Sequence, residues 1–87
     1  MIKKRLQLIY EDAQGSTHGQ FFDSWKAIHI HLFENGLYKE FQVTDQSGDQ
    51  VLHYIKKAGG KYELKFSEKV PGSVLFEIVN RHASAHL

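Results

Sequence analysis

The chain contains no cysteine among its 87 residues. Disulfide bonds, thiolate nucleophiles, iron–sulfur clusters and cysteine-containing zinc sites are therefore excluded. Because small secreted domains often need disulfides, this absence favours a reducing compartment, and we expect a cytoplasmic protein. Long apolar runs are lacking as well. The stretch after the basic start, residues 6–10, is too short for a secretory leader or a membrane span, so we expect no membrane association.

Recognisable catalytic and cofactor motifs are also missing. The seven glycines fit neither the phosphate-binding loop nor the dinucleotide fingerprint. No serine lies in the strand-to-helix elbow that activates a serine nucleophile. We therefore expect a non-enzymatic protein without a cofactor.

The composition is that of one small folded domain. With 41% hydrophobic and 24% charged residues the chain is too apolar and too mixed in charge to be disordered. Its length predicts a single domain over residues 1–87, with 81–87 as a frayed tail. The net charge is +1, and residues 51–87 hold six basic and three acidic side chains. A dedicated nucleic-acid-binding domain usually has a stronger basic bias.

Hydrophobic alternation predicts strands at residues 3–11, 61–66 and 74–79. The last of these is almost continuously apolar, which is typical of a central strand. The polar residues 12–20 are predicted to form a loop. Residues 47–58 are predicted to form a helix, with Asp45 or Asp49 as its cap, Lys56 and Lys57 at its negative end and Gly59–Gly60 after it.

Residues 21–35 are compatible with two structures. Their aromatic and aliphatic residues recur at helical spacing, which allows a helix that stops at Gly36. Residues 27–33 also alternate strictly, and Asn35–Gly36 is a strong hairpin-turn signal. A two-residue turn places Ile28, Ile30 and Leu32 on one apolar face of a hairpin with residues 38–43. The hairpin is the favoured interpretation, and the helix remains the alternative.

Together these elements predict an α+β fold. The order is strand, strand, strand, helix, strand, strand (β-β-β-α-β-β), in a single-layer, mostly antiparallel sheet. One main helix packs on the apolar face of this sheet.

The favoured hairpin gathers a candidate partner-binding surface on its other face. That surface consists of His29, His31, Phe33, Tyr38 and Glu40. Mixed aromatic and polar patches are common in protein interfaces. We therefore expect an interaction module that binds a protein partner or a second copy of itself as a homodimer. Since histidine titrates near neutrality, binding at such a surface would depend on pH.

Three alternatives use the same surface. Phe33 and Tyr38 with nearby lysines are compatible with a nucleic-acid platform, although acidic neighbours oppose it. A histidine beside Glu40, with Lys26 or Lys39, resembles the acid–base groups of a small ribonuclease. His29, His31 and Glu40 with His53 are a less favoured metal-ligand set. Trp25 is expected to be a core residue.

Overall fold

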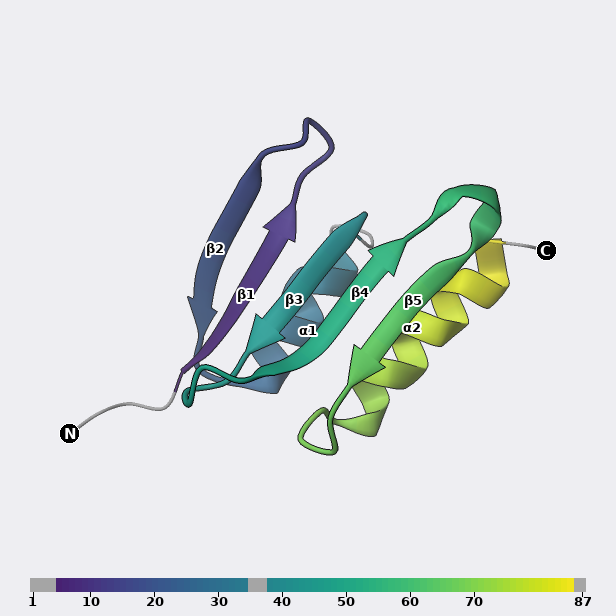
Figure 1. The fold of residues 1–87 in the computed structure, drawn as a ribbon. Coiled ribbons are helices and arrows are strands. Elements are labelled where there is room, and N and C mark those ends of the chain that lie inside the picture. Colours follow the sequence, from purple (N-terminus) through teal and green to yellow (C-terminus); the bar gives the residue numbers. More distant parts are fainter. Residues whose placement is uncertain (1–4, 35–37, 86–87) are drawn as a thin grey trace.

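Five antiparallel strands form one sheet, and two helices cover one of its faces (Figure 1). The computed structural model describes residues 5–34 and 38–85, with side chains through residue 81. The elements are β1 (Leu6–Glu11), β2 (Thr17–Phe22), α1 (Trp25–Glu34), β3 (Glu40–Thr44), β4 (Gln50–Lys56), the short 3-10 turn η1 (Ala58–Gly60), β5 (Tyr62–Phe66) and α2 (Gly72–Ala85). Across the sheet the order is β2-β1-β3-β4-β5, which places β2 and β5 at the two edges. The α+β class and the antiparallel sheet are confirmed, whereas the predicted order of elements is wrong.

The turns of two hairpins have the same arrangement of an aspartate and a glycine. Asp12 Oδ1 accepts the backbone N–H groups of Gln14 and Ser16, and Gly15 adopts φ +85°. In the β3–β4 connection Asp45 Oδ1 accepts the N–H groups of Ser47 and Asp49, and Gly48 has φ +86°. Glycine tolerates this left-handed conformation without steric cost, and the aspartate satisfies backbone donors in the turn. Each Asp-X-X-Gly segment therefore reverses the chain in a few residues.

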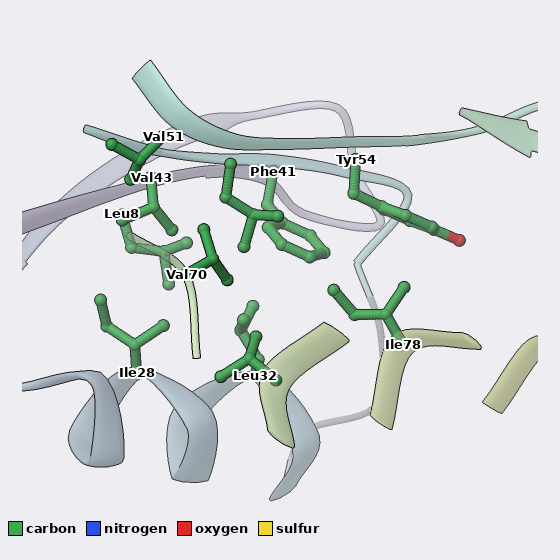
Figure 2. Packing of buried hydrophobic residues seen from close by; sticks show 11 residues of the cluster. Leu8, Ile28, Leu32, Phe41, Val43, Val51, Tyr54, Val70 and Ile78 are labelled. Atoms are coloured by element: carbon green, nitrogen blue, oxygen red, sulfur yellow. The ribbon is translucent and has the colours of Figure 1, made fainter. Parts of the chain in front are cut away.

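The core lies between the sheet and the helices (Figure 2). Leu8, Phe41 and Tyr54 project from neighbouring strands toward Leu32 of α1 and Ile78 of α2. Phe41 and Tyr54 face each other across β3 and β4 with ring centroids 5.1 Å apart. Burial of such side chains is the main favourable term in folding a domain of this size. Trp25 is partly buried against this cluster, as expected for a core residue.

The predicted hairpin over residues 28–33 is wrong, because this segment is α1. Ser24 caps the helix, since its Oγ accepts the N–H of Ala27 at 3.2 Å. Ile28 and Leu32, four residues apart, are buried, while Ile30 is 49% exposed. Strand β3 pairs instead with β1 and β4, through Phe41 opposite both Tyr10 and Tyr54. The Asn35–Gly36 turn lies outside the described residues.

Three further predictions are corrected by the same structure. Residues 50–56 form strand β4, not a helix, and residues 17–22 form strand β2, not a loop. The predicted central strand 74–79 belongs to α2, whose buried residues Val74 and Ile78 are one helical turn apart. That helix continues to Ala85, where a frayed tail was predicted from residue 81. The strands predicted at 3–11 and 61–66 are confirmed over Leu6–Glu11 (β1) and Tyr62–Phe66 (β5), and residues 3–4 lie outside the described part of the chain. Neither described helix has the length and apolarity needed to cross a bilayer.

Candidate partner-binding surface

Five rings gather beside strand β2, on the side of the sheet that carries the helices. Tyr10 of β1 lies at the centre, stacked on Tyr38 with ring centroids 4.3 Å apart and on His18 of β2 at 5.2 Å. His31 of α1 contacts Tyr10 at 5.5 Å and Phe22 of β2 at 5.3 Å. We call Tyr10, His18, Phe22, His31 and Tyr38 the aromatic–histidine cluster. It joins β1, β2, α1 and the segment before β3 through stacked and tilted rings, which are favourable aromatic geometries.

A carboxylate extends the cluster at the β1–β2 turn. His18 Nε2 lies 2.7 Å from Asp12 Oδ2. This contact, together with the N–H groups of Ser16 and Gln14, lowers the pKa of the Asp12 carboxyl. The same carboxylate thus closes the turn with one oxygen and orients the His18 ring with the other. The turn and the ring cluster form one connected unit.

The other end of the cluster is a tyrosine–histidine pair. Tyr38 Oη and His31 Nε2 are 3.1 Å apart in a partly buried hydrogen bond. Burial raises the pKa of Tyr38, and the neighbouring Tyr10 raises it further. The Tyr38 hydroxyl therefore stays protonated at neutral pH and can donate to or accept from the imidazole. This contact fixes the chain that enters β3 against α1.

Strand β2 offers an edge next to these rings. Five of its six residues are exposed, and Thr17–Phe22 contains no Asp, Glu, Lys or Arg. Asp12 N–H donates to Ser16 O at 2.9 Å, which makes this couple a hydrogen-bonded pair of the hairpin. Because such pairs alternate along antiparallel strands, His18 and Gln20 bond to β1. The backbone groups of Gly19 and Phe21 therefore point away from β1, toward the free edge.

The five residues predicted to share one surface are divided among three places. His31 and Tyr38 meet in the aromatic–histidine cluster. His29 and Phe33, four residues apart on α1, contact each other edge-on at 4.8 Å on another side of the helix. Arg81 of α2 covers Phe33, with its guanidinium 5.1 Å from the ring and Nη2 bonded to Phe33 O at 2.8 Å. Residues two apart share a face on a strand but are about 200° apart on a helix, which is why the predicted group separates.

Glu40 lies on the outer face of the sheet, the face turned away from both helices. Its Oε2 is 3.0 Å from His53 Nε2 of β4, and Lys65 of β5 stands opposite His53 in the strand register. A histidine, a carboxylate and a lysine are thus neighbours here, but they differ from the predicted ribonuclease-like set. Glu11 is directly opposite Glu40. The two carboxylates make this part of the outer face electronegative, which opposes binding of a phosphate backbone.

The chain matches no family model, no curated protein and no solved structure.

Metal binding at the predicted ligands is not supported by their placement, since His31 and Glu40 lie on opposite faces of the sheet. Across residues 5–34 and 38–81, no group of three or more histidine and acidic side chains is arranged to hold a metal ion. Sequence reasoning placed residues 12–20 in a loop and so missed strand β2, which brings His18 and Phe22 into the cluster with Tyr10 and His31. The Asp12-X-X-Gly15 turn signal, repeated at Asp45 and Gly48, was the cue to a β1–β2 hairpin.

Proposed function

We propose that this protein is a non-enzymatic interaction module that binds an extended segment of a partner protein along the edge of β2. The observation that carries the proposal is the uncharged, exposed edge of β2 beside the aromatic–histidine cluster. An added strand would bond to the outward backbone groups of Gly19 and Phe21. The neighbouring rings would then contact side chains of that strand.

The chemistry of this edge favours a peptide over other ligands. Natural proteins usually protect edge strands with lysines, other charges or proline, because an open edge recruits additional strands. Strand β2 has none of these residues. The exposed ring of His18 and the exposed Phe21 give alternate-side contacts of the kind that set sequence preference in strand addition.

Nucleic acid is a weaker candidate on the same observations. The outer face, which would be the stacking platform of an open sheet, has Glu11 and Glu40 facing each other and Glu63 two strands from Glu40. These charges repel phosphates. In the aromatic–histidine cluster, Tyr10 is stacked on both His18 and Tyr38, so its ring is not an open platform for a base.

The test is a proline substitution that blocks the edge without disturbing the hairpin. In Gly19→Pro the lost N–H is one that points away from β1, and edge strands accept proline at such positions. A displayed library of random peptides is selected on the wild-type protein, and the selected peptides are titrated against both proteins by calorimetry. We expect Gly19→Pro to remain folded and to lose at least tenfold in affinity, or about 1.4 kcal/mol.

Gln20→Pro is the matched control for the backbone argument. Its lost N–H is one that bonds to β1, so this variant should lose the hairpin and show disordered amide signals over β2. Amide protection of Gly19 and Phe21 by a bound peptide would locate the added strand. Selected peptides that bind Gly19→Pro as tightly as the wild type would contradict the proposal.

A further inference from the structure

The second edge of the sheet has a chemistry of its own. Among the described residues, two large hydrophobic side chains with high exposure lie at the β5 side: Phe66 (57%) and Val79 (47%). Phe66 ends β5, and Val79 is on α2, which runs beside β5 (Figure 1). Exposed apolar side chains that gather in one region commonly mark an interface.

The backbone of β5 has hydrogen-bonding groups directed outward at defined positions. Lys57 N–H donates to Lys61 O at 2.8 Å, and Ser67 N–H donates to Val51 O at 2.9 Å. Both couples lie in the β4–β5 register, so alternation makes Glu63 and Lys65 the residues that bond to β4. The N–H and C=O groups of Leu64 and Phe66 therefore point away from β4.

A second copy of this edge fits the first when Leu64 lies on a two-fold axis. Antiparallel pairing about that residue makes Leu64 a hydrogen-bonded pair with the partner's Leu64, and places Phe66 opposite the partner's Tyr62. These side chains lie on the inner face of the sheet, next to α2. The apolar residues of the two edges would thus meet on one side.

The same register pairs opposite charges on the outer face. Glu63 stands opposite the partner's Lys65, and Lys65 stands opposite the partner's Glu63. They occupy non-hydrogen-bonded positions, where side chains of an antiparallel pair are closest. Glu63 also lies 3.2 Å from Lys57 Nζ, but both side chains are about half exposed, which leaves the carboxylate room for a second cation. One register therefore satisfies the backbone, the apolar side chains and the charges together.

Helix α2 adds apolar surface at the same boundary. Its buried residues Val74 and Ile78 face the core, and Arg81 reaches toward α1 to bond Phe33 O. At 100° per residue, Leu75 and Val79 then lie on the flank of α2 that is directed away from α1, toward the β5 edge. A paired β5 edge brings the two copies of this flank together beneath the extended sheet.

We infer that the protein forms a two-fold symmetric homodimer by antiparallel pairing of β5 with β5 of a second copy, giving a continuous ten-stranded sheet. The dimer leaves β2 free at both outer ends, so it is independent of the partner proposed for β2. Because the interface is a short strand pair with few apolar side chains, we expect it to bury less than the roughly 1,200–2,000 Å² of a standard stable interface. The equilibrium is therefore expected to depend on concentration.

The test is a charge swap monitored by sedimentation velocity between about 10 and about 500 μM at low salt. Lys65→Glu places Glu63 opposite a glutamate of the partner subunit at both symmetric positions, so the dissociation constant should rise at least about tenfold. Glu63→Lys should do the same through lysine–lysine contacts. The double variant Glu63→Lys/Lys65→Glu restores opposite charges and should dimerise like the wild type, and an equimolar mixture of the two single variants should form a heterodimer.

Lys26→Glu, the same charge change at an exposed position on α1, is the matched control and should leave dimerisation unchanged. Hydrogen exchange at high and low protein concentration locates the contact, since a β5 dimer protects Leu64 and Phe66 but not Gly19. A protein that stays monomeric over the whole range, a dimer unaffected by Lys65→Glu, or protection at Gly19 in place of Leu64 would overturn the inference. The last result would instead assign self-association to β2, while failure of the β2 peptide test would leave the β5 dimer standing.

Discussion

Replacing Leu32 with alanine probes the centre of the core. Leu32 is fully buried between the sheet and the helices (Figure 2). Leucine-to-alanine changes at such sites lower the free energy of unfolding by about 3–5 kcal/mol, through lost burial and a residual cavity. A domain of this length has a total stability on the order of 4–13 kcal/mol. We therefore expect Leu32→Ala to lose a large part of that stability, with a melting temperature lower by about 12–40 °C.

Ile30→Ala is the matched comparison, because it also removes methyl and methylene groups from α1. Ile30 is 49% exposed and lies two residues, or about 200°, away from Leu32 around the helix. Surface substitutions of this kind change stability by about 0.5 kcal/mol or less, and alanine's higher helix propensity offsets part of the lost contact.

The contrast between these two variants also distinguishes a helix from a hairpin. In a strand Ile28, Ile30 and Leu32 would share one buried face, and both substitutions would be costly. Urea unfolding followed by Trp25 fluorescence and far-ultraviolet circular dichroism gives both free energies, provided that the denaturant slopes agree with that of the wild type. Similar losses for Leu32→Ala and Ile30→Ala, or a loss above about 2 kcal/mol for Ile30→Ala alone, would refute the helical packing.

Two further predictions concern pH. His18 and the backbone N–H groups of the turn lower the pKa of Asp12 in the folded state, so the ionised carboxylate stabilises the fold fully above the ordinary value of 3.8, and this stabilisation is lost as the pH falls below it. Asp12→Asn should therefore make the free energy of unfolding depend less on pH in the acid range. An unchanged pH dependence would contradict the assignment. Burial raises the pKa of Tyr54 to about 12, so between pH 10 and 12 the unfolded chain releases a proton that the folded protein retains, and stability falls. Ultraviolet titration should show one tyrosine that ionises late in the wild type and is missing in Tyr54→Phe. Titration of every tyrosine with a midpoint near pH 10 in the folded protein would contradict this assignment.

The strands at the two confirmed positions were predictable because their patterns are local. In β1, Leu8 and the partly buried Tyr10 alternate with Ile9, and in β5 Leu64 lies between the charged Glu63 and Lys65. An alternating pattern in a short segment needs only one buried face to be stable as a strand. The same reasoning found β3 through Phe41 and Val43, although it assigned the wrong neighbouring strand.

Strand β4 was misread because of a register irregularity that sequence periodicity cannot reveal. The pairing shifts between Val43 and Thr44, so consecutive residues Val51 and Leu52 are both buried. Two adjacent buried residues with Ile55 three positions on mimic helical spacing. The Asp45-X-X-Gly48 turn, which was interpreted as a helix cap, belongs to the hairpin that precedes this strand.

The candidate site was predictable only in part. His31 and Tyr38 do meet, but through a helix side chain that reaches across to the segment before β3. The grouping of His29, Phe33 and Glu40 with them depended on a strand that does not form. Their role in partner binding stays a prediction, and the aromatic–histidine cluster replaces the predicted face as the surface to test.

Local sequence was sufficient for the α+β class, for β1 and β5, and for the expectation that Trp25 packs against the core, because each rests on patterns shorter than about ten residues. Tertiary structure determined the secondary structure of the segments whose hydrophobic pattern fits both a strand and a helix. The pattern of residues 27–33 is compatible with a strand, the favoured interpretation, and with a helix. In the structure β3 has β1 and β4 as its neighbours in the sheet. Because both positions beside β3 are occupied, residues 27–33 do not join the sheet there. They form a helix over the sheet that buries Ile28 and Leu32. Likewise, the apolar run 74–79 becomes α2 because Val74 and Ile78 complete the core, which leaves Phe76 and Val79 at the surface.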